Sequence, residues 1–229
     1  MSMRVQGVRR YPVKSMGGEA LGSVAVDRRG LVGDRWYAVV DTDGRFASGK
    51  DTRRFRRRDA VFGYAARTEA TGGVVVARGA ASWIVGNPAL DEELSTAMGT
   101  RVQVLPEGGV PHQDAAGVSL VGRASLRWCA DRWGGSADVR RTRSNLLLET
   151  DEPFVEESWV GREIGIGSTR LRVTGAAPRC RMVDVDQDGV QTGTRWLQHL
   201  GAVRGLDLAV YAEVVEPGLI SVGDVVHAG

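Results

Sequence analysis

The sequence has only two cysteines, Cys129 and Cys180, among its 229 residues. So few cysteines exclude a disulfide framework and the zinc modules that are built from cysteine clusters. No apolar run approaches the roughly 18 residues that a membrane helix needs, and the N-terminus lacks the apolar segment of a secretion signal. We therefore expect a cytoplasmic protein that has no membrane contact.

Lysine is as rare as cysteine, because Lys14 and Lys50 are the only two lysines among 30 basic residues. The 28 acidic residues leave a net charge of +2, and a content of 42% hydrophobic and 25% charged residues is ordinary for a globular protein. The length corresponds to one large domain or two small ones. Against this background, each lysine and each cysteine is a candidate for a specific role.

One basic run, RRFRRR at 53–58, contains an aromatic residue. Such a run is typical of a nucleic-acid contact, of a solvated face, or of a positive rim that attracts an anionic ligand. The pI near 8.7 and the absence of a recognisable nucleic-acid-binding motif favour the last two interpretations. We therefore do not expect a nucleic acid as partner.

Short β-prone segments separated by Gly, Asp and Pro turns predict a mainly β (α+β) fold, with two β-barrel-like subdomains and a few short helices. The Pro/Gly-rich segment 106–118 indicates a boundary between an N-terminal barrel at 1–105 and a second domain at 106–229. Apolar periodicity predicts helices at 90–98, 123–133 and 194–203. Strands are expected at 4–8, 23–26, 36–40, 45–48, 63–68, 74–77, 81–85, 102–105, 145–148, 170–173, 211–215 and 222–226.

The two cysteines differ in their surroundings. Cys180 lies between Arg179 and Arg181, and neighbouring cations favour the thiolate, which is both the nucleophile and the metal ligand. The alternative is a buried structural cysteine beside two solvated arginines. Cys129 lies on the apolar face of the helix expected at 123–133, which predicts a packed and inert thiol.

Lys14 is a candidate for an anion contact. It stands beside Ser15 in a loop that precedes two glycines, whose backbone N–H groups could approach a phosphate. Arg35 and Arg143 each come just before an expected strand, and their planar guanidinium groups could complete a site for a dianionic phosphate. The spacing alone does not show that these residues meet, and an ordinary surface loop is the alternative.

Other motifs are missing or incomplete. The three histidines, His112, His199 and His227, share no spacing typical of metal ligands, and the chain has no P-loop, GxSxG, GxGxxG or CxxC motif. The acids at 184–188 alternate as in a calcium loop, but the stretch lacks the glycine and the distal glutamate of an EF-hand. We interpret that segment as a turn.

Five short motifs follow one another along the chain: YPVKS at 11–15, DRWYAVVDTDG at 34–44, TRSNLLLET at 142–150, PRC at 178–180 and GLISVGDVV at 218–226. Together they resemble the MOSC family, named after the C-terminal domain of molybdenum cofactor sulfurase. The resemblance is to members that have an N-terminal β-barrel, such as the mitochondrial amidoxime-reducing component and its bacterial relatives.

The resemblance implies a molybdenum cofactor, in which molybdenum bound to molybdopterin is held by a protein cysteine. Cys180 matches that metal ligand and catalytic residue. Ala177 stands where many relatives have a second cysteine, which excludes a vicinal disulfide but leaves metal ligation intact. The residues assigned to cofactor binding, with Asp114 as a weaker match, are Lys14, Ser15, Arg35, Asp114, Arg143, Asn145 and Arg179.

The resemblance also implies an oxidoreductase that reduces N-oxygenated small molecules, such as hydroxylamines, amidoximes or N-oxides. Electrons would come from a separate flavin, haem or iron–sulfur protein, because the chain has no motif for these groups. The alternative is a sulfur carrier or sulfurtransferase that uses Cys180 as a persulfide or nucleophile. The chain lacks the desulfurase part of the cofactor sulfurases, so pyridoxal phosphate is not expected.

Overall fold

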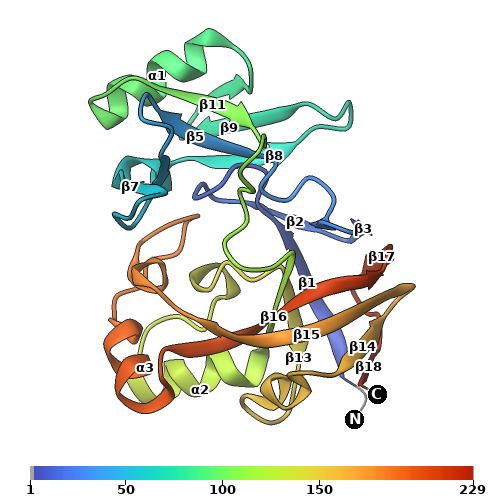
Figure 1. Cartoon of the computed structure of the whole chain (residues 1–229). Coiled ribbons are helices and arrows are strands. Elements are labelled where there is room, and N and C mark those ends of the chain that lie inside the picture. Colours follow the sequence, from blue (N-terminus) through green and yellow to red (C-terminus); the bar gives the residue numbers. More distant parts are fainter. Residues whose placement is uncertain (1–2, 229) are drawn as a thin grey trace.

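The computed structural model describes residues 3–228, which form four β-sheets and three α-helices (Figure 1). The largest sheet has eight strands and contains both the first and the last strand of the described chain. In spatial order its strands are β18 (Val226–Ala228), β14 (Glu163–Ile166), β15 (Thr169–Pro178), β16 (Asp207–Glu216), β12 (Val118–Gly122), β13 (Leu146–Glu149), β1 (Arg4–Arg10) and β2 (Glu19–Leu21).

The smaller sheets have four, three and three strands. They are β11 (Val102–Pro106), β5 (Tyr37–Asp41), β6 (Phe46–Ser48) and β7 (Phe55–Arg57); β10 (Ala81–Ile84), β9 (Val74–Arg78) and β8 (Ala65–Thr68); and β17 (Gly218–Ser221), β3 (Ser23–Asp27) and β4 (Gly30–Leu31). The α-helices are α1 (Pro88–Met98), α2 (Arg123–Trp133) and α3 (Trp196–Arg204), and the 3-10 helices are η1 (Asp59–Gly63), η2 (Val139–Arg141), η3 (Val155–Trp159) and η4 (Arg181–Asp184). None of the described helices is long and apolar enough to cross a membrane.

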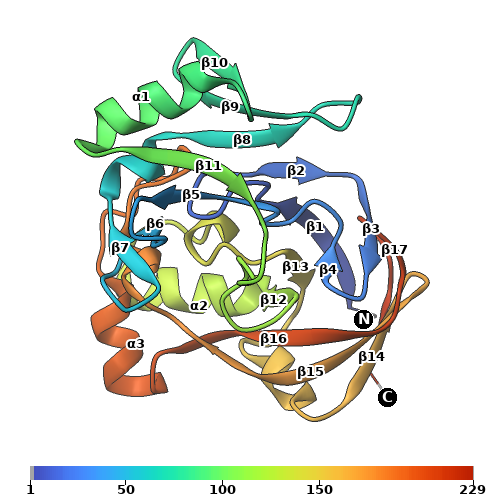
Figure 2. The same ribbon diagram turned by 45° about the horizontal axis from the view of Figure 1, so that its top comes forward.

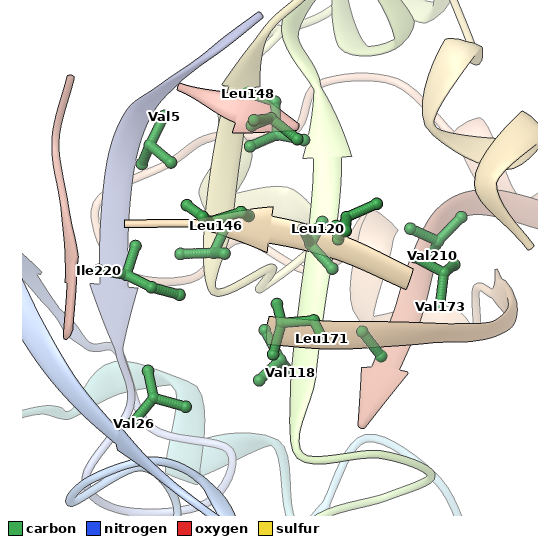
Figure 3. Close-up of a cluster of buried hydrophobic side chains, with 14 of the residues drawn as sticks. Val5, Val26, Val118, Leu120, Leu146, Leu148, Leu171, Val173, Val210 and Ile220 are labelled. Carbon is green, nitrogen blue, oxygen red and sulfur yellow. The ribbon is translucent and has the colours of Figure 1, made fainter. Parts of the chain in front are cut away.

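The eight-stranded sheet packs on both faces, because side chains alternate along each strand. Leu146 and Leu148 of β13 lie in one hydrophobic core, to which ten strands contribute residues; Figure 3 shows part of this core. Leu147 between them packs into a second core, which α2 and α3 complete on the other face. A third core forms around Leu90 and Leu94 of α1, mostly from residues between β5 and β11, together with Val13 and Met16.

Strand β1 joins the start of the chain to the C-terminal sheet. It pairs antiparallel with β13, so that Val5 lies opposite Leu148. Strands β3 and β17 also pair, and they run side by side at one edge of the molecule in Figure 2. The first 31 residues therefore complete sheets made by residues 118–228, whereas residues 37–106 form sheets of their own. The domain boundary expected between residues 105 and 106 stays a prediction.

The expected mainly β fold with a few short helices is confirmed, and so are the three helices. Most expected strands are present with bounds shifted by at most four residues, and two differ more from the structure. The strand expected at 170–173 continues to Pro178, because β16 pairs with it across irregularities that absorb extra residues. The strand expected at 222–226 is wrong, because Val222 and Gly223 form a turn in which Gly223 has a φ of 95°.

A buried carboxyl group anchors the N-terminus of α2. Glu156 is 0% exposed, and its Oε1 accepts hydrogen bonds from the backbone N of Gly122 at 2.9 Å and from Oγ of Ser125 at 2.7 Å. Its Oε2 has no partner within residues 3–228. Burial raises the pKa of this carboxyl group above its ordinary value of 4.5, since a charge is poorly stabilised away from water.

Glu156→Gln should make the stability of the protein less dependent on pH. Because the pKa is raised in the folded state, the parent protein loses free energy of unfolding as the pH rises from about 4.5 through the raised pKa. Glutamine does not titrate, so the variant should lack this decline. Urea unfolding at a series of pH values measures the effect, with the exposed Glu152→Gln as control. An equal decline in both variants would contradict the prediction.

Candidate functional site

A cavity of about 500 Å³ lies between the N-terminal part of the chain and the C-terminal sheet. Every site residue assigned from the sequence lines this cavity, although the residues come from distant segments. They are Lys14, Ser15, Arg35, Asp114, Arg143, Asn145, Arg179 and Cys180. Residues of four of the five motifs thus meet in one place, and their roles toward a cofactor stay predictions.

Lys14 is only 5% exposed. Its Nζ donates to the backbone O of His112 at 2.5 Å and to Oδ1 of Asp114 at 2.9 Å. Burial lowers the pKa of Lys14 to about 8, against the opposing effect of the Asp114 carboxylate. The hydroxyl of the neighbouring Ser15 donates to the backbone O of Ala47 at 2.9 Å. At neutral pH the cavity therefore contains a protonated lysine, which loses its charge near pH 8.

Arg35 and Arg143 meet over the ring of Tyr11, which is fully buried. Their guanidinium carbons lie 5.0 Å and 4.2 Å from the ring centroid, and Nη2 of Arg35 donates to the backbone O of Arg143 at 3.2 Å. The buried carboxylate of Asp34 pairs with Arg35. Arg143 donates Nη1 to Oε1 of Gln187 at 3.1 Å, while its Nη2 is buried without a partner in the described chain. One donor of Arg143 is therefore available to a ligand.

Three of these residues have strained backbone conformations. The φ angles of Ser15, Arg35 and Arg143 are 70°, 53° and 54°, in the left-handed region that residues other than glycine rarely adopt. Each such conformation costs on the order of 1 kcal/mol and persists only where the surrounding structure enforces it. Strain of this kind concentrates at functional sites, and here it falls on residues that the sequence assigned to an anion.

Asp114 lies on a segment that is pressed against the N-terminal strands. Gly117 and Gly30 meet backbone to backbone: a Cβ on Gly117 would lie 2.3 Å from the O of Arg29, and a Cβ on Gly30 would lie 2.2 Å from the O of Gly117. Only glycine allows so close an approach. This contact fixes the segment, and with it the carboxylate of Asp114 beside Lys14.

Asn145 and Arg179 form part of the wall on the side of the large sheet. Oδ1 of Asn145 accepts from Oγ of Ser119 at 2.9 Å, so part of its amide already binds the scaffold. Arg179 donates Nε to the O of Ala177 and Nη1 to the O of Thr142, both at 2.9 Å. Burial lowers the pKa of Arg179, and its Nη2 has no partner among residues 3–228. Arg179 thus also keeps a donor for a ligand.

Cys180 is a half-buried free thiol between β15 and η4. The adjacent Arg181 binds both carboxylate oxygens of Asp59 at 2.8 Å, which ties the segment after the cysteine to the N-terminal part of the chain. Cys129, by contrast, is 0% exposed in the core beneath α2, and burial raises its pKa to about 12. The prediction of a packed Cys129 is confirmed.

The interpretation of residues 184–188 as a turn is confirmed in part, because Asp184 ends η4 and the turn itself lies at Asp188 and Gly189. Gln187 and Val190 exchange backbone hydrogen bonds of 3.2 Å and 2.9 Å. Oδ2 of Asp188, on this turn, accepts from Nη2 of Arg9 at 2.7 Å. Within residues 3–228 no group of three or more His, Cys, Asp or Glu side chains is placed to bind a metal ion.

Sequence reasoning missed three cations of the cavity, Lys50, Arg54 and Arg141. The rarity of lysine was a usable signal for Lys50. No feature of the sequence separates Arg54 from the other arginines of the run at 53–58. Arg141 also lines the cavity, but its guanidinium is occupied by the backbone O atoms of residues 183, 192 and 194.

The cavity is strongly positive, because seven of its lining side chains are Lys or Arg and one, Asp114, is a carboxylate. The unpartnered buried donors of Arg143 and Arg179 require an acceptor. The thiol of Cys180 in the same wall is a soft ligand that suits molybdenum. These features fit a cofactor that carries an anionic phosphate group and a metal bound by one protein thiolate.

Family models match both parts of the sequence. The MOSC domain matches residues 107–227, and the MOSC N-terminal beta barrel domain matches residues 2–78. The chain belongs to the MOSC family. The two matches leave residues 79–106 of this MOSC protein between them.

This MOSC protein is similar to molybdenum cofactor sulfurases. It is 35% identical over 95 residues to the enzyme so named from Anopheles gambiae and 44% identical over 55 residues to the one from Homo sapiens. These segments are 37% and 24% of this chain but only 12% and 6% of the two sulfurases. The solved structure of the YuaD protein from Bacillus subtilis aligns with a TM-score of 0.48 at 13% identity, over 100% of this chain and 96% of that chain.

Gly117→Ala should destabilise the protein strongly. The added methyl group would lie 2.3 Å from the backbone O of Arg29, and each of these two residues directly precedes a paired strand, β12 or β4, which limits its movement. We expect a loss of roughly 2 kcal/mol or more in the free energy of unfolding, measured by urea titration. Gly22→Ala is the matched control, because a Cβ there meets nothing within 4 Å. Equal stability of the two variants would contradict the close contact.

Anion binding in the cavity should weaken as the pH rises through 8. Lys14 loses its charge near its pKa of about 8, whereas sulfate, the probe, keeps its double charge. Calorimetric titration with sulfate at pH values on either side of 8 should show falling affinity in the parent protein. In Lys14→Met the affinity should be lower and the decline absent. Lys50→Met replaces the other lysine, and its sulfate affinity should still fall as the pH rises. If the sulfate affinity of Lys14→Met also falls, the titration of Lys14 is not the cause.

Proposed function

We propose that this MOSC protein binds a molybdenum cofactor in the cavity and uses it to reduce N-oxygenated small molecules. One observation carries the proposal: seven cationic side chains and a half-buried free thiol, Cys180, line the same cavity. An anionic cofactor whose metal takes a thiolate ligand requires this combination. Family membership and the similarity to molybdenum cofactor sulfurases support it.

Lys14, Arg35 and Arg143 would hold the phosphate group of the cofactor. Lys14 brings an ammonium group that Asp114 orients, and Arg143 brings an Nη2 that no described residue binds. Fixed cations of this kind bind an anion without reorganising, because the scaffold has already oriented them. Arg179 offers a further donor beside Cys180. Ser15, next to Lys14, binds Ala47 of β6, and Asn145, near Arg143, binds Ser119 of β12.

When bound, the cofactor supplies a metal that accepts and passes on two electrons. Reduction of an N-hydroxyl group takes up two electrons and two protons, breaks the N–O bond and releases water. Cys180 would bind the metal as a thiolate, so its proton leaves when the metal binds. The substrate would be a small molecule, and a separate flavin, haem or iron–sulfur protein would supply the electrons.

A turnover assay tests the reaction. Protein produced with added molybdate should convert benzamidoxime to benzamidine when a chemical reductant replaces the natural electron donor. Protein that contains molybdenum but converts no amidoxime, hydroxylamine or N-oxide would contradict the reductase proposal.

The second candidate function is sulfur transfer through Cys180. The similarity to molybdenum cofactor sulfurases and the half-buried free thiol favour it. In that reaction the Cys180 thiolate would attack the outer sulfur of a persulfide on a separate donor protein. The donor's S–S bond breaks, the donor leaves as a thiolate, and Cys180 holds the transferred sulfur as a persulfide. A mass increase of about 32 Da that a thiol reductant removes, in protein without molybdenum, would support this function over the reductase.

Cys180→Ala should abolish retention of molybdenum. The substitution removes the thiolate that would ligate the metal, while the half-buried position tolerates the smaller side chain. The molybdenum content of the purified protein should fall from about one atom per chain to a small fraction of that value. Metal and pterin analysis measures it.

Cys129→Ala is the matched control. It removes the other thiol of the chain, which is packed in the core at 0% exposure. We expect this variant to retain molybdenum despite some loss of stability. Full retention of metal by Cys180→Ala would show that the ligand assignment is wrong.

A further inference from the structure

Lys50 and Arg54 are cations of the cavity to which the proposed cofactor contacts assign no role. They stand between β6 and β7, on either side of a short loop. Nζ of Lys50 and the guanidinium carbon of Arg54 lie 4.5 Å and 5.2 Å from the ring centroid of Phe55. Nζ of Lys14 lies 5.1 Å from the same ring. Three positive charges thus gather around one buried aromatic side chain.

Neither Lys50 nor Arg54 forms an ion pair within residues 3–228, and this distinguishes Arg54 from the later arginines of its run. Arg56, Arg57 and Arg58 each pair with an aspartate, at N–O distances of 3.7, 2.9 and 3.4 Å. Their charges are therefore matched by these aspartates. The charges of Lys50 and Arg54 face the cavity unmatched, because its one carboxylate, Asp114, is bound to Lys14.

The donors that remain fit a carboxylate group. Arg54 donates Nη2 to the backbone O of Gln113 at 3.0 Å, which fixes the guanidinium plane. Its Nε is buried and has no partner in the described chain. This fixed donor and the flexible ammonium group of Lys50 can each bind one oxygen of the same carboxylate. An anion placed there also relieves the repulsion between the two cations.

We propose that Lys50 and Arg54 bind a carboxylate group of the substrate, so that the protein prefers N-oxygenated compounds that are also carboxylic acids. The choice of N-oxygenated compounds rests on the proposed function. The carboxylate site rests only on the contacts of Lys50, Arg54 and Phe55. The two parts can therefore fail separately.

A binding experiment tests the carboxylate site without turnover. Molybdenum-loaded protein is titrated calorimetrically with benzoate and with benzamide, its uncharged counterpart. The parent should bind benzoate at least roughly tenfold more tightly than benzamide. Lys50→Met and Arg54→Met should each reduce the benzoate affinity roughly tenfold. Arg53→Met is the matched control, since it removes an exposed arginine of the same run that does not line the cavity.

A kinetic experiment then tests the substrate preference. The ratio of kcat/KM for 4-carboxybenzamidoxime to kcat/KM for benzamidoxime should exceed one in the parent and in Arg53→Met. In Lys50→Met it should fall roughly tenfold. Equal binding of benzoate and benzamide by the parent, or unchanged benzoate affinity in both Lys50→Met and Arg54→Met, would overturn the site. Benzoate binding that depends on Lys50 and Arg54, without turnover of any N-oxygenated compound, would uphold the site and refute the reductase.

Discussion

Like charges held close together are the constraint on which this structure depends. The guanidinium carbons of Arg9, Arg35 and Arg143 lie 5.8, 5.0 and 4.2 Å from the ring centroid of Tyr11. The ring face attracts all three cations. The buried carboxylate of Asp34 offsets part of their charge, and its Oδ1 also accepts a hydrogen bond from the backbone N of Tyr11 at 2.8 Å. Asp188 pairs with Arg9, so among residues 3–228 it is Arg143 whose charge has no carboxylate partner.

Such a cluster requires a scaffold that does not relax when the ligand is absent. Two ion pairs tie the segment around the cysteine to the N-terminal strands: Asp188 with Arg9 at 2.7 Å, and Arg181 with Asp59 at 2.8 Å. The first pair is largely buried and the second is exposed, so most of the restraint comes from the first. Because the cations cannot separate, an anion that binds between them adds its binding free energy to the stability of the fold.

The sequence predicted local structure well wherever periodicity is long and regular. The helix at 123–133 was predicted because Leu126, Cys129 and Ala130 share a face, and it has the expected bounds. The strand expected at 222–226 failed because the apolar run there is interrupted by Gly223, whose turn geometry depends on a hydrogen bond between Asp224 and Ser221. Periodicity does not report such a bond.

The site was predictable only in part, for a related reason. The motif residues Lys14 and Cys180 were found, but their position around one cavity follows from strand pairing across the whole chain, which the sequence pattern does not contain. Arg54 reaches the cavity because β7 pairs in parallel with β6, with Phe55 opposite Phe46. Two strands of three residues each are too short to produce a periodic pattern in the sequence. Arg54 therefore could not be distinguished from the solvated arginines next to it.

The pairing of β1 with β13 has a consequence for how the protein forms during synthesis. Val5 has Leu148 as its partner, so the first strand leaves the ribosome long before its neighbour exists. Until then β1 can pair only with the nearby β2, and its other edge stays open, where it can associate with other chains. The large sheet therefore cannot form strand by strand from the N-terminus. Pairing of β1 with β13 is also slow, because the two strands are far apart in the sequence.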